Sequence, residues 1–241
     1  MIRWQSAACT NVGKRRKINE DAYLDRPDVG LWVVADGMGG HQSGDVASKM
    51  IVDSLQQITA HTTLGDYIDA VSKRLQKINA QLCALAEKSF KDQIIGSTVA
   101  VLMGNDERCA FLWAGDSRVY RYRKGKLNQL TRDHSLYGEL REKGFDISDE
   151  IASQMSASNV ITRAIGAERD LQLEHEFAEV LDGDIYLLCS DGLDKEVSLD
   201  EIEQILTKGN CDSSSKALVD LALERGARDN VTVIVIQAKK H

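Results

Sequence analysis

Residues 31–40 (LWVVADGMGG) join an unbroken apolar run to a carboxylate and a glycine-rich turn. Five apolar residues in succession are typical of a buried strand, and the glycines that follow end it. A carboxylate at the end of such a strand is costly to bury unless it has a partner. Asp36 is therefore both a marker of the fold and a candidate functional residue.

Similar apolar runs recur along the chain and predict further strands. Turn-forming residues 104–106 and 124–125 separate several of them in the manner of hairpins. Besides 31–35, the expected strands are 4–10, 22–25, 98–103, 109–114, 119–123, 172–177, 185–189 and 231–236.

Helical spacing appears between the clusters of strands. Apolar residues at steps of three and four predict a helix over 64–85, and others are expected from about residue 43 and over 199–206 and 214–224. The stripe in 64–85 fits either a helix packed on a sheet or a coiled-coil seam. Because strands and helices alternate in groups, we predict an α+β fold in which helices cover antiparallel sheets, as in a sandwich of two sheets with helices outside.

The overall charge and the cysteine content narrow the range of possible functions. The formal net charge of −7 argues against nucleic acid and anionic membranes as partners. The five cysteines contain no C-x-x-C pair, which favours reduced thiols and a cytoplasmic location over disulfides or a zinc ribbon. Neither a signal peptide nor a membrane-length apolar run is expected. With no linker-like segment, residues 1–241 are expected to form one domain.

Aspartates recur beside turns at the ends of predicted strands. Each alone fits a turn or cap residue, but the shared context favours one carboxylate cluster. We expect these carboxylates to converge without a histidine or lysine to offset them, and to bind Mn²⁺ or Mg²⁺, which prefer oxygen ligands. The residues are Asp21, Asp36, Asp116, Asp191 and Asp229.

Two further residues have alternative interpretations. His41, in the glycine-rich turn after Asp36, fits either a general acid for a leaving group or a solvated loop residue. Arg16, in the basic run 14–17, fits either a surface patch or a bidentate ligand of phosphate.

The chain resembles the PPM family, the metal-dependent phosphatase 2C-like protein phosphatases, in its compact bacterial form. The resemblance extends from Gly13 to Ile236. The matching stretches are G13-x-x-R-x-x-N-E-D21, A35-D-G-M-G-G-H-x-x-G44, G96-S-T98, A114-G-D-S-R118, T131-R-D-H-S135, I161-T-R-A-I-G166, S190-D-G-L193 and D229-N-V-T232.

This resemblance implies a four-layer α-β-β-α sandwich and a role for each matching residue. Asp36 would bridge two metals, with Asp191 and Asp229 completing the shell of the first. The carbonyl of Gly37, with Asp21, would serve the second. Asp116 and Asp191 would hold a third, looser metal. Arg16 matches the phosphate-binding arginine and His41 the proposed acid, and residues from about 133 to 159 would form a flap.

The expected reaction is hydrolysis of phosphoserine and phosphothreonine in proteins by water activated on the two metals. The expected partners are phosphoproteins and a cognate bacterial serine/threonine kinase, and the protein is expected to be a monomer. Two alternatives are a non-catalytic phosphoprotein-binding pseudophosphatase and a phosphatase of an anti-anti-sigma-type regulator. The first would lack metal aspartates, and here all are present.

Overall fold

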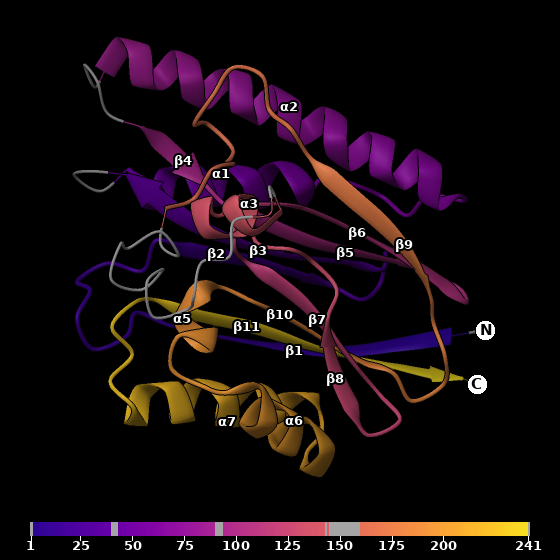
Figure 1. Cartoon of the computed structure of the whole chain (residues 1–241). Coiled ribbons are helices and arrows are strands. Elements are labelled where there is room, and N and C mark those ends of the chain that lie inside the picture. Colours follow the sequence, from indigo (N-terminus) through magenta and orange to yellow (C-terminus); the bar gives the residue numbers. More distant parts are fainter. Residues whose placement is uncertain (1, 40–42, 90–93, 143, 145–159, 241) are drawn as a thin grey trace.

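Two antiparallel sheets lie face to face between two pairs of helices in the computed structural model (Figure 1), which describes residues 2–39, 43–89, 94–142, 144 and 160–240. The first sheet has the strand order β1-β11-β10-β7-β8. Its strands are β1 (Ile2–Asn11), β7 (Arg118–Arg123), β8 (Lys126–Gln129), β10 (Ile185–Cys189) and β11 (Val231–Lys240).

The second sheet has the strand order β2-β3-β5-β6-β9, and a short strand, β4, pairs with the end of β3. The apolar run at 31–35 forms the first part of β3, and all five of its residues are buried. The strands are β2 (Asp21–Arg26), β3 (Leu31–Gly39), β4 (Ile95–Ser97), β5 (Val99–Asn105), β6 (Arg108–Ala114) and β9 (Glu174–Glu179).

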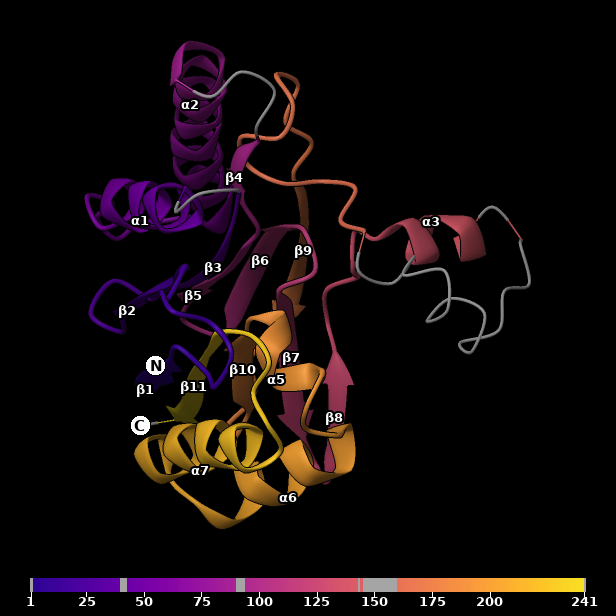
Figure 2. The same cartoon turned by 90° about the vertical axis from the view of Figure 1, so that its left-hand side faces the viewer.

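Helices cover the outer face of each sheet, which confirms the predicted four-layer sandwich (Figures 1 and 2). α1 (Gly44–Leu55) and α2 (Leu64–Ser89) pack on the second sheet, whereas α6 (Leu199–Lys208) and α7 (Cys211–Glu224) pack on the first. A separate apolar cluster, which includes Trp32, Phe111 and Ile234, fills the space between the two sheets. The molecule thus has three apolar layers, one between each pair of neighbouring structural layers.

The apolar stripe of α2 faces this core. Leu64, Ile68, Val71, Leu75, Ile78 and Leu82 are all buried in the cluster between the helices and the second sheet. The interpretation as a core-facing helix is therefore confirmed over the coiled-coil alternative. None of the helices in the described ranges is long and apolar enough to cross a membrane.

Three short elements differ from the sequence-based prediction. β4 has three residues, too few to show a period, and β8 (KLNQ) is mostly polar and is paired with β7 through the turn at Lys124 and Gly125. Both turn residues have positive φ, 50° and 82°, as tight hairpins of this kind require. A further helix, α5 (Asp191–Asp194), directly follows β10. Strand β9 begins at Glu174, two residues later than predicted, because its pairing with β6 begins at the pair Trp113 and Glu174.

Candidate active site

Asp21 and Asp36 face each other across neighbouring strands. They are register partners on β2 and β3, and the backbone N–H of Thr98 donates to the Asp36 carbonyl at 2.9 Å. The hydroxyl of Ser190, from the opposite sheet, donates to Asp21 Oδ2 at 2.8 Å. The other oxygen of Asp21 is buried without a hydrogen-bond partner. The two sheets therefore meet at this carboxylate pair, which lies within β3 and at the start of β2.

Gly37 allows the backbone segments around this pair to approach closely. A Cβ at this position would lie 2.1 Å from the carbonyl oxygen of Gly44 and 2.5 Å from that of Glu20. The N–H of Gly37 donates to the Glu20 carbonyl at 3.1 Å, which ties β3 to the residues before β2. Only glycine fits here without displacing backbone atoms. This close packing explains why a glycine follows Asp36.

Asp191 and Asp229 reach the same place from the first sheet. A Cβ on Gly192 would lie 1.9 Å from the carbonyl oxygen of Asn230, so α5 packs directly against the loop that carries Asp229. The Asn230 side-chain amide donates to the carbonyls of Val12 and Ile18 at 2.9 and 3.0 Å. Asn230 thereby holds the loop before β11 against the basic segment near the N-terminus.

Arg16 extends from that basic segment to the carboxylate cluster. Its Nη2 donates to Asp229 Oδ2 at 2.7 Å, and about half of the side chain remains exposed. The two residues are 213 positions apart in the sequence. Arg16 is therefore part of the site.

Asp116 lies in the connection between β6 and β7 and is 6% exposed. One of its carboxylate oxygens is buried and has no hydrogen-bond partner. The same is true of one carboxylate oxygen of Asp191. An unpartnered buried carboxylate oxygen is costly, and a nearby positive charge is one way to offset that cost.

The electrostatics of the cluster follow from burial and from mutual repulsion. Burial raises the pKa of Asp21 to about 7 and that of Asp116 to about 7, and in both cases Asp191 adds to the rise. Burial also raises the pKa of Asp36 well above its usual range, and the charges of Asp21, Asp191, Asp116 and Asp229 raise it further. The five carboxylates therefore influence one another electrostatically.

A cavity of about 380 Å³ opens over this group. Both sheets contribute to it, and so does Ile161, which follows the predicted flap. It is lined by Arg16, Glu20, Asp36, Gly37, Met38, Gly39, Thr98, Ile161, Asp191, Lys195 and Asp229. Of the predicted site residues, Asp21 and Asp116 lie outside this lining, Asp21 paired with Asp36 on the neighbouring strand. His41 lies outside the described residues.

Lys195 was not expected at the site. Its ammonium group donates to Asp191 Oδ2, four residues earlier in the chain. The prediction that the carboxylates lack a neighbouring lysine is therefore wrong. The residues Asp191 and Lys195 have the i,i+4 spacing of a helical ion pair, but this signal becomes visible only once α5 is recognised.

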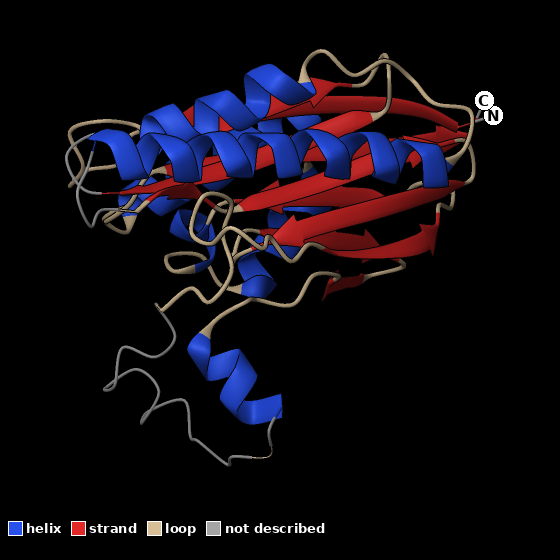
Figure 3. Ribbon diagram, turned by 90° about the horizontal axis from the view of Figure 1, so that it is seen from above, coloured by secondary structure: helices blue, strands red, loops and turns tan. Residues whose placement is uncertain are grey.

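The predicted flap is described only in part. α3 (Leu136–Glu142) projects from the body of the sandwich (Figures 2 and 3), and residues 143 and 145–159 lie outside the described ranges. The base of the segment is tied down beside Asp116, because the N–H of His134 donates to the Gly115 carbonyl at 2.9 Å. An isolated β-bridge pairs Ser135 with Ile161, and Ile161 lines the cavity.

The donor chemistry suits a hard divalent cation. The described part of the chain contains no group of three His, Cys, Asp or Glu side chains already arranged as a metal-binding cluster. Two of the carboxylates are instead paired with Arg16 and Lys195. The unpartnered oxygens of Asp21 and Asp191, together with an all-oxygen donor set, nevertheless fit Mn²⁺ or Mg²⁺ and do not favour zinc.

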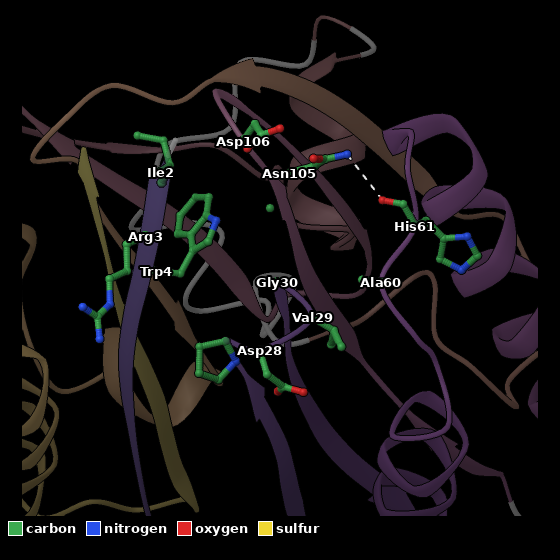
Figure 4. Close-up of a pocket in the computed structure, with 12 residues that line it drawn as sticks. Ile2, Arg3, Trp4, Asp28, Val29, Gly30, Ala60, His61, Asn105 and Asp106 are labelled. Atoms are coloured by element: carbon green, nitrogen blue, oxygen red, sulfur yellow. Dashed lines mark hydrogen bonds between the residues drawn. The ribbon is translucent and has the colours of Figure 1, made fainter. Parts of the chain in front are cut away.

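A larger cleft, of about 760 Å³, is lined by the start of β1, the turn between β2 and β3, and the turn between β5 and β6 (Figure 4). Trp4 and Val29 form part of its wall, and Asn105 donates to the backbone carbonyl of His61 at 3.5 Å. None of the predicted site residues lines this cleft. Size alone would therefore select the wrong cavity, since the carboxylates converge on the smaller one.

Comparisons with known proteins agree with this geometry. The family model described as protein phosphatase 2C matches residues 13–223. The serine/threonine phosphatase stp of Listeria welshimeri is 33% identical over 236 residues, which cover 95% of this chain and 93% of that protein. The chain therefore belongs to the protein phosphatase 2C family, the metal-dependent serine/threonine protein phosphatases.

Two solved structures extend the comparison. PppA, a key regulatory component of T6SS in Pseudomonas aeruginosa, has a TM-score of 0.89 and 41% identity, covering 98% of this chain and 97% of that one. The catalytic domain of the phosphatase PstP, solved in complex with two manganese ions, has a TM-score of 0.87 and 31% identity over all of both chains.

Proposed function

We propose that this protein hydrolyses phosphoserine and phosphothreonine in other proteins, with two divalent cations bound at the carboxylate cluster. The observation that carries the proposal is the meeting of Asp36, Asp191, Asp229 and Arg16 in one cavity between the sheets. A cluster of acids alone would fit many sites. An exposed guanidinium beside it adds a ligand for a phosphoryl group.

Each carboxylate has a proposed place. Asp36 would be a ligand common to both cations, Asp191 and Asp229 would hold the first, and Asp21 with the Gly37 carbonyl would hold the second. The manganese pair in PstP supports this number of ions. A third, looser ion between Asp116 and Asp191 is a separate prediction of the family resemblance.

The chemistry divides between the cations and the chain. When bound, the cations supply an activated water at neutral pH and neutralise charge on the phosphoryl oxygens. Arg16 binds and orients the phosphoryl group and stabilises the charge that develops on it. To do so, its guanidinium must turn from Asp229 toward the substrate. The proposed general acid, His41, would give a proton to the leaving serine or threonine oxygen.

The wider setting is also proposed. We assign residues 1–241 to one phosphatase domain, with a flap from about 133 to 159, acting as a cytoplasmic monomer on phosphoproteins made by a serine/threonine kinase. The five free thiols support a reducing compartment. The presence of all five carboxylates favours catalysis over a pseudophosphatase, and nothing in the site favours an anti-anti-sigma-type substrate.

Metal-dependent turnover tests the proposal. We expect the protein to hydrolyse a phosphothreonine peptide and p-nitrophenyl phosphate with Mn²⁺ or Mg²⁺ present, and to lose this activity in EDTA. Excess Mn²⁺ should restore it, because the carboxylates alone cannot activate water. Release of inorganic phosphate measures both reactions. Undiminished hydrolysis after complete metal removal would rule out the proposed mechanism.

Arg16→Ala tests the assignment of the guanidinium. We expect kcat/KM to fall about 10- to 100-fold, mainly through KM, because a hydrogen bond to a charged group contributes about 1.5–3 kcal/mol. The change in KM is measured with the phosphothreonine peptide. Arg15→Ala is the matched control, since this exposed neighbour belongs to the same basic run. If the two substitutions had equal effects, Arg16 would act only as one charge of a general basic surface patch and not as a specific ligand of the phosphoryl group.

A further inference from the structure

Lys195 places a permanent positive charge among the carboxylates. Its ammonium group is bonded to Asp191 Oδ2, and it also interacts electrostatically with Asp116 and Asp229. Asp191 keeps its second oxygen buried and unpartnered, as does Asp116. One side of Asp191 is thus available to a cation in the cavity, while its other side is already neutralised by the chain itself.

The position of Lys195 is determined by several contacts of α5. The N–H of Lys195 donates to the Asp191 carbonyl at 3.1 Å, and the neighbouring Leu193 and Val197 are buried. Arg118 Nη1 binds Asp194 at 2.8 Å, which anchors the residue immediately before Lys195. The lysine is therefore held at the cavity by a packed helix and does not reach it from a free loop.

An ordinary helical ion pair in the same protein provides a contrast. Lys216 and Asp212 on α7 have the same i,i+4 spacing, and their side chains are 63% and 68% exposed. The side chain of Asp191 is only 13% exposed. Water screens the first pair, whereas the charge of Lys195 acts on partly buried carboxylates that repel one another.

We propose that the Lys195 ammonium replaces a third divalent cation between Asp116 and Asp191, so that this protein binds two such ions and no third. The inference rests on the proposed function, because it concerns the same cluster. Its physical basis is competition between a tethered and a free cation. The ammonium is held beside Asp191 by its own backbone, so its effective concentration there far exceeds that of a weakly bound ion in solution.

The test counts bound ions. Mn²⁺ is titrated into the full-length protein while the electron paramagnetic resonance signal of the free ion reports binding. We expect two bound ions in the wild type and in Lys195→Arg, which keeps the charge. Lys195→Gln should gain a third, weaker ion. Asp116→Asn should remove that third ion from Lys195→Gln but leave the wild-type count unchanged. Lys216→Gln is the matched control and should bind two ions.

The opposite results are equally specific. A third ion in the wild type that Asp116→Asn removes would overturn the inference while leaving the proposed function intact, and so would a count of two in Lys195→Gln. Binding of no Mn²⁺ by the wild type, with no phosphatase activity, would overturn the proposed function and this inference with it. Because Lys195 is 40% exposed, its substitution is not expected to disturb folding, and the melting temperature checks this.

Discussion

Asp36→Asn is expected to lower kcat by about 10³-fold or more, the scale on which removal of one key electrostatic group acts in an active site. Asp36 lines the cavity and faces Asp21 across the strand pair, so it is the carboxylate best placed to contact both proposed cations. Asparagine keeps the shape of the side chain but loses its charge. Turnover of the phosphothreonine peptide at saturating Mn²⁺ measures the loss.

Stability separates this effect from simple unfolding. Burial and four neighbouring carboxylates raise the pKa of Asp36, so its charged form destabilises the fold at neutral pH when no cation is bound. Asp36→Asn is therefore expected to be at least as stable as the wild type in EDTA while being inactive. Asp53→Asn, an exposed substitution on α1, is the control and should retain activity. An active Asp36→Asn variant would exclude Asp36 as the shared ligand.

Mn²⁺ is expected to raise the melting temperature of the wild type by roughly 5–10 °C. An ion that binds only the folded state stabilises it by RT ln(1 + [L]/Kd), about 2.7 kcal/mol at one hundred times Kd. For a domain of this size, that free energy corresponds to several degrees. Differential scanning calorimetry with and without millimolar Mn²⁺ measures the shift, and Asp36→Asn should reduce it.

The same carboxylates predict how this shift depends on pH. In the folded protein, burial raises the pKa values of Asp21 and Asp116 to about 7, above the ordinary aspartate value of 3.8. Between those values the folded state binds more protons than the unfolded state, so stability in EDTA should fall as pH rises from about 4 through 7. Mn²⁺ replaces those protons, and its stabilising effect should be larger at pH 8 than at pH 6. If Mn²⁺ did not change the melting temperature at either pH, the aspartates would not form one metal site.

Much of the fold could be predicted because its signals are local. The apolar run before Asp36 and the apolar stripe of α2 are patterns within single elements, and burial of one face produces them directly. β4, β8 and α5 gave no such signal because each is short and is stabilised by its neighbours. Strand β4 exists through its pairing with β3, and α5 through its packing against the Asn230 loop.

The sequence by itself determined which residue types carry the chemistry: strand-associated aspartates, an arginine in a basic run, and a family pattern that orders them. Only the tertiary structure decided which of these groups meet. It joins Arg16 to Asp229 and links Asp21 to Ser190 across the sheets. The physical reason is that electrostatic interaction depends on distance in space and on burial, and neither follows from spacing along the chain when the partners lie on different sheets.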